Sequence, residues 1–484
     1  MSAATSIGRG TLPSRSIRMS QQNKPMSRRQ HNDLNVGFRP EDAIREVQEL
    51  NCRAKWTRSI AISPQSAIQA GSMDVHTMAD DLVAWLKRVA VPCPFGCNGD
   101  PLRILNDALS AADVVFLGEA NHFVHEKTDF RLLFARHFVS RGWSGFMEEI
   151  GWSDGWRIGR YMVDGDPHWL ARLSLFGHRG DSRTDRDDRP TGIFKASFDA
   201  YPHDLMRSEH ERFYHGLSAA GDGQLGYFGV DIDGDPGGAY ADIDVLTSPW
   251  AASTEVAAWR AKLDRVPGES INQEIRRVHR ALPILPASMD TEARLAVIAA
   301  MHALTDSLEY VLRTYSASSY EATRPGMALR EQAMKRRYAA ARSTMGTSKP
   351  VLMGHALHLA KNDLLIDPIA AVGPGGGRVT SLGHHIVQEL GKKAFSVWMI
   401  YGGGEDSQPL IDQSRIADFP ADTLNVRLAA FNEPTLFLLD SVPAELLDAP
   451  VKIGQMYNSV FRTTLRRQVD ALFYVPRVTP MKLD

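Results

Sequence analysis

The stretch "DVVFLGEANHFVHE", residues 113–126, joins an apolar run to a cluster of ionisable side chains. The run Val114–Leu117 is typical of a buried strand, and a glycine separates it from Glu119, His122, His125 and Glu126. A strand interior excludes such groups, because burying an unpaired charge costs at least several kcal/mol. The stretch therefore predicts a buried strand whose carboxyl end opens into a polar cleft.

The residues that follow predict a β-α-β unit. The segment "DFRLLFARHFVSRG" (129–142) has helical periodicity, and "SGFMEEI" (144–150) is typical of a second buried strand. This order of elements favours a parallel sheet.

Five further segments have the composition of buried strands: 226–232, 349–355, 394–400, 435–440 and 470–476. Between the third and fourth core strands, residues of about 250–345 have mostly helical periodicity. We therefore expect an α/β fold with a mostly parallel central sheet flanked by helices, and a large helical insertion within it. The charge-dense segment 177–192 is interpreted as a surface loop that acts as a lid beside the site.

The N-terminal residues differ from the rest in composition. Residues 1–32 contain six Arg or Lys and no Asp or Glu, which is typical of an organellar transit peptide. We prefer a disordered tail or a start codon assigned too early, since Met19, Met26 and Met73 could each begin the protein. The expected division is a flexible segment, 1–75, and a catalytic domain, 76–484.

The overall composition excludes several classes of function. The 484 residues include 55 Lys or Arg and 57 Asp or Glu, and no basic stripe is dense enough for a nucleic acid. The apolar run "ARLAVIAAMHAL" (293–304) is shorter than the roughly 20 residues that span a bilayer, so we expect no membrane segment. Three cysteines cannot form a disulfide framework, which favours a reducing, cytoplasmic location.

Polar residues follow four of the expected strands, and in an open parallel sheet ligands bind beyond the carboxyl ends of the strands. We therefore expect these residues to converge on one cleft: Glu119 with His122, Glu148 with Glu149, Asp231 with Asp233, and His355 with His358.

Two other kinds of site stay open at this level. The segment "GWSDG" (151–155) matches the G-x-S-x-G pattern of a serine nucleophile, although Ser153 also suits a helix N-cap. The Glu, Asp and His side chains are suitable ligands for Zn or Mn, but their spacing matches no closed ligand motif. We predict no cofactor and no metal.

Taken together, several motifs resemble the erythromycin esterase family. They are "LGEANHFVHE" followed by Arg131, "EIGW" (149–152) leading into "RIGRYM", "GHALH" (354–358) and "DALFYVPRVTPM" (470–481). Enzymes of that family hydrolyse macrolide lactones without a serine nucleophile or an obligatory cofactor. The resemblance implies that His122 is the general base for water, with Glu119, Arg131, Glu149, His355 and His358 lining the same cleft.

The chain departs from the family's usual motifs at Asn121, Phe123 and Ala356, which puts the macrolide substrate in doubt. Our first hypothesis is a metal-independent hydrolase of a small-molecule carboxylic ester or lactone, in antibiotic resistance or secondary metabolism. The alternatives are a metal-dependent hydrolase similar to Tiki-type metalloproteases, a serine hydrolase through Ser153, and a non-hydrolytic binding or biosynthetic protein. The neutral imidazole is a suitable general base near neutral pH.

Overall fold

The computed structural model describes residues 75–481, except 98–99, 174–206, 234–236, 265, 267, 315–316, 319–320, 364–365, 369–378 and 409–412. All described residues belong to one unit, Pro64–Asp484. The expected N-terminal segment lies almost wholly outside the described residues, and so does the expected lid at 177–192.

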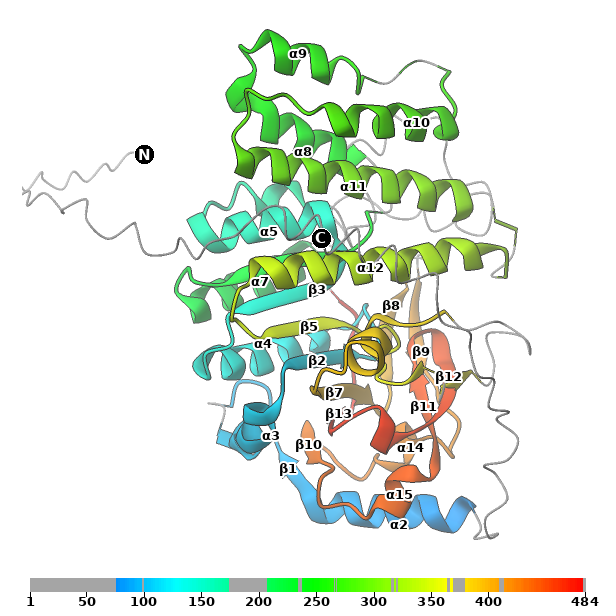
Figure 1. Ribbon diagram of the computed structural model, residues 1–484. Helices are drawn as coiled ribbons and strands as arrows, with labels where there is room; N and C mark the ends of the chain where they lie inside the picture. Colours follow the sequence, from blue (N-terminus) through cyan, green and yellow to red (C-terminus); the bar gives the residue numbers. More distant parts are fainter. Residues whose placement is uncertain are drawn as a thin grey trace, which may run out of the picture. The chain divides into compact units, whose positions relative to one another are not determined.

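An eight-stranded sheet in the order β1-β10-β13-β7-β2-β5-β3-β4 forms the centre of the fold (Figure 1). Its strands are β1 (Ala90–Pro92), β2 (Val114–Glu119), β3 (Gly145–Gly151), β4 (Gly226–Asp231), β5 (Pro350–His355), β7 (Ala394–Tyr401), β10 (Thr435–Leu438) and β13 (Ala471–Val475). The six strands from β13 to β4 are parallel, whereas β10 is antiparallel to both of its neighbours. The predicted α/β class with a mostly parallel sheet is confirmed.

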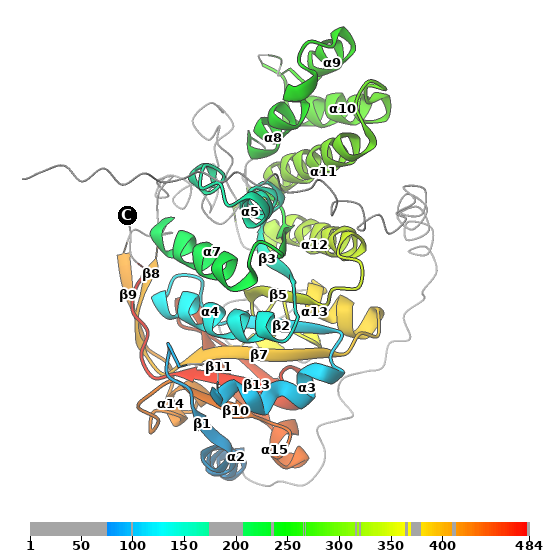
Figure 2. The ribbon, with the colours of Figure 1, turned by 90° about the vertical axis from the view of Figure 1, so that its left-hand side faces the viewer.

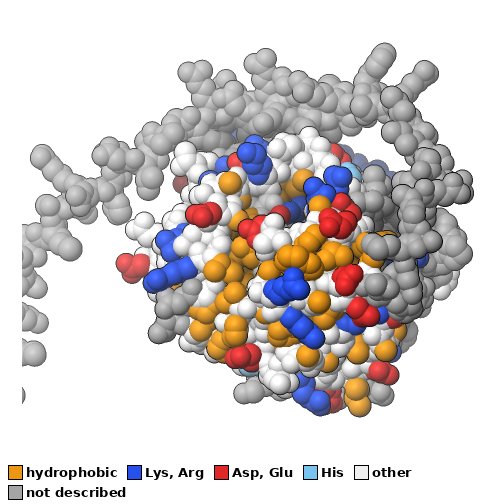
Figure 3. Space-filling model, turned by 90° about the horizontal axis from the view of Figure 1, so that it is seen from below, with side chains coloured by type: hydrophobic (Ala, Val, Ile, Leu, Met, Phe, Trp, Pro, Cys, Tyr) orange, Lys and Arg blue, Asp and Glu red, His pale blue; other side chains and the backbone are white. Residues whose placement is uncertain are grey.

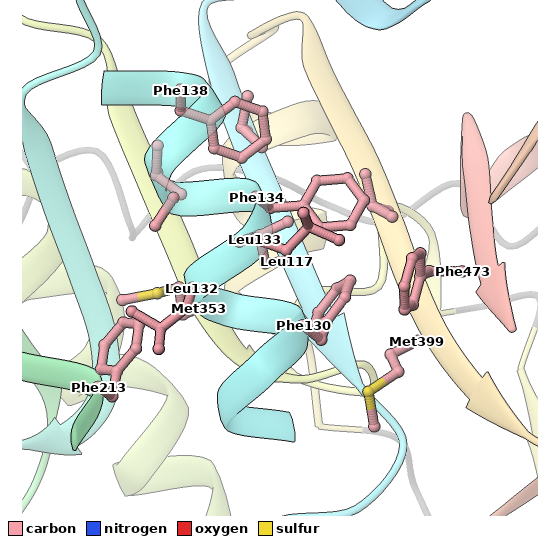
Figure 4. Close-up of a cluster of buried hydrophobic side chains, with 14 of the residues drawn as sticks. Leu117, Phe130, Leu132, Leu133, Phe134, Phe138, Phe213, Met353, Met399 and Phe473 are labelled. Atoms are coloured by element: carbon pink, nitrogen blue, oxygen red, sulfur yellow. The ribbon is translucent and has the colours of Figure 1, made fainter. Parts of the chain in front are cut away.

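Successive side chains of a strand point to opposite faces of the sheet, and here both faces are covered by helices. In β2, Val115 and Leu117 belong to the core that includes α4 (His125–Ser140) and α7 (Arg207–Gly221). Figure 4 shows Leu117 beside the α4 side chains of this core. On the opposite face, Val114 and Phe116 pack with α12 (Arg324–Thr344). Burial on both sides explains the continuous apolar runs of the central strands.

The remaining helices complete these two layers. The first face also carries η2 (Asp100–Leu105), α3 (Asn106–Ala111), α5 (Trp152–Asp164) and η3 (Leu170–Arg172). The second carries α2 (Val75–Val89), α13 (Leu382–His384), η10 (His385–Glu389), α14 (Leu424–Arg427) and α15 (Ala444–Asp448).

The segment between β4 and β5 is helical and has a hydrophobic core of its own. It consists of α8 (Gly237–Thr247), η6 (Ser248–Trp250), α9 (Thr254–Arg260), α10 (Ile271–Ala281), η7 (Leu282–Ile284), α11 (Thr291–Thr314), η8 (Glu321–Thr323) and α12. Figures 1 and 2 show α8–α11 stacked together beyond the β4 side of the sheet.

The helix α11 is longer than the apolar run noted in the sequence. By length and composition it could span a membrane, with a mean hydropathy of 1.3 over 18 residues, but half of that window is buried. It packs against α8, α10 and α12, and a core helix of a soluble protein passes the same test.

Two small sheets, which the sequence did not predict, follow in the C-terminal third. One has the order β11-β12-β6, formed by Pro450–Gln455, Ser459–Thr464 and Asp367–Pro368, and the other pairs β8 (Gly404–Gln408) with β9 (Gln413–Ala417). The short helical turn η11 (Met456–Asn458) connects β11 to β12, and η12 (Leu465–Arg467) lies between β12 and β13 of the central sheet. Figure 3 views the face on the side of α2 and α15, where hydrophobic side chains gather over the middle.

Candidate functional site

The carboxyl ends of four parallel strands bring the predicted residues together. Glu119 ends β2 and is paired in register with His355, which ends β5. Glu149 lies in β3 next to β5, and Asp231 ends β4 next to β3. Gly354 is required here, because a Cβ at this position would lie only 2.8 Å from the Glu149 side chain.

Glu119 is completely buried and is held by two cations of α4. Arg131 Nε donates to Glu119 Oε2 at 2.8 Å, and Arg131 Nη2 lies 2.7 Å from the same oxygen. Lys127, one helical turn earlier, places Nζ 3.9 Å from Glu119 Oε1. Burial opposes ionisation of Glu119, but Arg131, Lys127 and His122 outweigh it and lower the pKa of this carboxyl group to about 2.

His122 forms a hydrogen bond with Glu119 through one ring nitrogen and leaves the other open. Its Nδ1 is 2.7 Å from Glu119 Oε1, and an ionised carboxylate can only accept, so Nδ1 carries the proton. In the neutral ring, Nε2 then has the free lone pair. Nε2 lies 4.0 Å from Glu149 Oε1, and 20% of the side chain is exposed. This is the arrangement of an oriented general base.

Arg131 is itself fixed by a second carboxylate. Its Nη1 donates to Glu148, whose other oxygen accepts from the hydroxyls of Tyr214 (3.1 Å) and Tyr227. Only 5% of the Arg131 side chain is exposed. The guanidinium group therefore lies buried between the carboxylates of Glu119 and Glu148.

Glu149 is the centre of a second charged cluster. Its Oε1 accepts from Arg330 Nη2 at 2.7 Å and lies 3.1 Å from His358 Nε2, while Oε2 accepts from the backbone N–H of His355 at 2.6 Å. Burial alone would raise the pKa of Glu149, but His358, His122 and Arg330 bring it well below its usual value. Arg330 also donates to both carboxylate oxygens of Asp231.

His358 is a cation in this cluster. Its Nε2 faces Glu149, and its Nδ1 forms a short hydrogen bond with Glu331 of α12. Burial disfavours the charged ring, but Glu149 and Glu331 outweigh this effect and raise the pKa of His358 to about 10. A ring whose pKa lies this far above neutrality is unsuited to the role of general base near neutral pH.

His355 has the opposite character. Burial, followed by the nearby His122, lowers the pKa of its ring to about 3, so the ring is neutral. Its Nδ1 accepts from the backbone N–H of Leu357 at 3.3 Å, so Nε2 carries the proton. This Nε2 is buried and has no hydrogen-bond partner among the residues that the structure describes. The ring centroids of His355 and His122 are 5.2 Å apart, which places a spare N–H donor next to the candidate base.

No group of three or more His, Cys, Asp or Glu side chains in the described part of the chain is placed to hold a metal ion. The carboxylates of Glu119 and Glu149 already interact with the guanidinium groups of Arg131 and Arg330. Such a donor set does not suit a cation. A cavity of about 370 Å³ lined by residues of β1 and of segment 430–435 includes none of the site residues, and we assign it no role.

The structure gives Ser153 a different place from the one expected. Gly151 is the N-cap of α5, so Ser153 lies inside the first turn rather than at the cap. Its Oγ donates to Asp233 Oδ2 at 3.2 Å, and no described histidine forms a hydrogen bond with it. Gly155 is needed because a Cβ there would lie 1.8 Å from the backbone nitrogen of Gly229 in β4. Close packing of α5 on β4 accounts for the second glycine of "GWSDG".

Asp233, which accepts a hydrogen bond from Ser153, and His125 lie outside the charged cluster around Glu119 and Glu149. The His125 ring points to α7, with Nδ1 2.5 Å from Glu209 Oε1. Three charged residues of the cluster were missed by sequence reasoning: Lys127, Arg330 and Glu331. Lys127 carried a weak signal, since it stands four residues before Arg131 on the same helix face.

The fold is shared with solved structures of low sequence identity. A succinoglycan biosynthesis protein is 14% identical over 85% of this chain and 99% of its own, with a TM-score of 0.59. A Bacillus cereus protein is 15% identical over 84% and 99%, with a TM-score of 0.60. A mutant of the erythromycin esterase EreC, in its open conformation, is 15% identical over 80% and 96%, with a TM-score of 0.54. No protein-family model and no curated protein matches the sequence. The chain thus has the fold of an erythromycin esterase, which biosynthesis-associated proteins also have.

Proposed function

We propose that the protein is a hydrolase that cleaves a carboxylic ester or lactone by general-base activation of water at His122. One observation carries the proposal: the ionised carboxylate of Glu119 holds the proton of His122 on Nδ1 and leaves the lone pair on Nε2, in a side chain that is 20% exposed. His122 Nε2 takes a proton from water, the water oxygen attacks the carbonyl carbon, and the proton later passes to the leaving alcohol.

The tetrahedral intermediate needs hydrogen-bond donors for its oxyanion. We assign this role to the Nε2–H group of His355, which has no partner in the described part of the chain and lies next to His122. The ring of His358, whose pKa is raised to about 10, lies with its centroid 6.5 Å from that of His355 and adds positive charge nearby. Arg131 has its guanidinium group between Glu119 and Glu148, so we assign it to holding Glu119 rather than to the oxyanion.

The substrate is proposed as an ester or lactone of secondary metabolism other than a macrolide. The three positions that depart from the family's motifs, Asn121, Phe123 and Ala356, are all buried. Asn121 Nδ2 donates to Asp406 at 2.6 Å and to the Tyr401 hydroxyl at 3.1 Å, which ties the loop after β2 to β7 and β8. The Asn121 side chain therefore helps to hold the loop that carries His122.

A panel of lactones and aryl esters tests the proposal, with two matched histidine variants. His122→Ala should keep the fold and lose at least about 100-fold in turnover, the smallest effect expected for a general base. His125→Ala removes an imidazole three residues away that points to Glu209, and it should turn over nearly normally. Equal losses in both variants would contradict the assignment of the base.

Two controls separate the other mechanisms. Dialysis against a strong chelator should leave turnover unchanged, and an inactive protein rescued by Zn or Mn would instead support a metal-dependent hydrolase. Ser153→Ala should also stay active, since Oγ is engaged by Asp233.

A second candidate function follows from the likeness to the succinoglycan biosynthesis protein: a non-hydrolytic biosynthetic role. Binding of the panel esters without turnover in the parent protein would favour it.

A further inference from the structure

Two cysteines stand close together outside the candidate site, in the turn "CPFGC" (93–97). The Sγ atoms of Cys93 and Cys97 are 3.9 Å apart, and both thiols are free. The backbone N–H of Cys97 donates to the carbonyl oxygen of Pro94 at 3.1 Å, which closes the turn and brings the two side chains together. Cys93 is fully buried, whereas Cys97 is partly exposed.

We propose that Cys93 and Cys97 are a redox-active dithiol, which a small disulfide such as glutathione disulfide converts into an intramolecular disulfide. A disulfide has a sulfur–sulfur distance of about 2.05 Å, so the two sulfur atoms must approach each other by roughly 2 Å. Gly96, between the two cysteines, adopts a φ of +85°, a left-handed conformation that suits the tight turn. A partner thiol at this distance distinguishes the pair from a lone reactive cysteine.

The oxidation takes place in two thiol–disulfide exchange steps. The Cys97 thiolate attacks one sulfur of glutathione disulfide, forms a mixed disulfide and releases one glutathione thiolate. Burial and the neighbouring Cys97 raise the pKa of the Cys93 thiol, so Cys93 loses its proton as it attacks the Cys97 sulfur and releases the second glutathione. The two thiol protons end on the two released glutathione molecules, and two electrons pass from the dithiol to the glutathione. Cys97 reacts first because it is the cysteine that reaches solvent.

The turn is linked by packing to the helix of the candidate site. The ring centroid of Phe95 is 5.7 Å from that of Phe473 in β13, which in turn lies 5.4 Å from Phe130 and 5.5 Å from Phe134. Figure 4 shows Phe473 facing these two residues of α4, the helix that also carries Arg131. Closing the disulfide changes the turn that holds Phe95. The dithiol itself does not depend on the proposed hydrolase function.

Oxidation of a full-length Cys52→Ser variant tests the proposal, because only the pair then contributes thiols. The folded protein is incubated with glutathione disulfide and analysed by intact mass and by thiol titration. We expect both thiols to disappear with a mass decrease of about 2 Da, and dithiothreitol to restore them. Peptide mapping of the unsubstituted chain should find Cys93 joined to Cys97, which keeps the test valid if the variant does not fold.

A second variant defines the alternative product. With both Cys52→Ser and Cys93→Ser, the chain keeps only Cys97 and should stop at a glutathione adduct. The proposal is overturned if the Cys52→Ser protein also stops at the adduct. It is equally overturned if both thiols survive in the folded protein under conditions that oxidise the same chain in urea.

Discussion

At the residue scale, Glu119 is the anion on which the candidate site is built. It is fully buried and faces two cations, Arg131 and Lys127, besides His122. Taking an ion out of water is costly, and the ion stays ionised only because opposite charges repay the cost. The two partners are not equivalent. Glu119 is stabilised as an anion by Arg131 and His122 as well as by Lys127, whereas Lys127 depends chiefly on Glu119 for its positive charge.

This asymmetry predicts unequal effects on stability. Glu119→Gln leaves two buried cations without their common anion, so it should cost about 3–5 kcal/mol of unfolding free energy. Lys127→Met replaces a buried ammonium by an apolar side chain of similar size, and Glu119 keeps Arg131. We expect a change within about 1 kcal/mol. Urea unfolding of both variants measures the two values, and a larger loss for Lys127→Met would contradict the assignment of Glu119 as the organising charge.

The two histidines after β5 predict opposite pH dependences of stability. His355 has its pKa lowered to about 3, so between pH 3 and the unfolded value near 6.5 the unfolded state binds more protons, and stability falls as the pH falls. His358 has its pKa raised to about 10, so its contribution is complete below about 6.5 and is lost as the pH rises through 10.

Replacing either ring by a side chain that does not titrate should therefore reduce the pH dependence of the unfolding free energy, on the acid side for one histidine and on the alkaline side for the other. His355→Gln should reduce the acid-side loss of unfolding free energy, and His358→Gln the alkaline-side loss. Thermal or urea unfolding from pH 4 to pH 10 gives the two curves. The pattern would be reversed if His355 were the cation and His358 the neutral ring.

At the element scale, the strands of the central sheet could be predicted because they are buried on both faces. Val114–Leu117 and 397–400 are continuous apolar runs, which is a local signal. The three-residue strand β1 and the strands of the two small sheets carry no such signal, since their pairing depends on partners distant in sequence. Glu119, Glu149 and His355 come together for the same reason, because neighbouring parallel strands end at one edge of the sheet. His122 and His358 each follow a strand end by three residues, whereas Arg131 comes from α4.

The missed site residues show where sequence reasoning stops. Arg330 forms a hydrogen bond with Glu149, although 181 residues separate the two in sequence. It lies in helix α12, whose own periodicity gives no reason to single it out. Glu331, the next residue, was missed for the same reason although it forms a hydrogen bond with His358. Charged residues on amphipathic helices are usually solvent-exposed, so only the packing of α12 on the second face of the sheet gives these two a role.

The contact between α5 and β4 leads to a prediction about "GWSDG". A Cβ on Gly155 would lie 1.8 Å from the backbone nitrogen and 2.3 Å from the Cα atom of Gly229. Backbone atoms cannot move aside as a flexible side chain can. Gly155→Ala should therefore push α5 from β4 and cost about 1–3 kcal/mol, the usual range for overpacking.

Gly403→Ala is the matched control for this prediction. Its added Cβ would meet only the Ala417 carbonyl oxygen at 3.8 Å, which is an ordinary contact. The unfolding free energy of Gly403→Ala should stay near that of the parent. Equal stability of the two variants would show that "GWSDG" does not pack as described and would reopen the nucleophile interpretation of Ser153.

At the scale of the whole molecule, the chain divides unevenly. One unit covers Met1–Ser63 and the other Pro64–Asp484, and all elements of the central sheet and of the candidate site belong to the second. Its first helix, α2, begins at Val75 and contributes Leu82 and Leu86, exposed by 1% and 0%, to the core over β10 and β13. A shortened chain should therefore begin before Val75 if α2 is to stay complete.

Two truncations test this boundary. A chain that starts at Met73 keeps α2 complete, so it should fold and retain parental turnover on any ester that the full chain cleaves. A chain that starts at Ala90 loses α2, and removing two fully buried leucines alone should cost about 4–10 kcal/mol, at 2–5 kcal/mol for each large-to-small change. That loss is comparable to the whole stability of a typical domain, about 5–15 kcal/mol, so the shorter chain should be insoluble or unfolded.

Expression, circular dichroism and ester turnover of the two chains test both expectations. An inactive but folded Met73 chain would show that residues 1–72 contribute to the site, whereas a stable Ala90 chain would show that α2 is not part of the core.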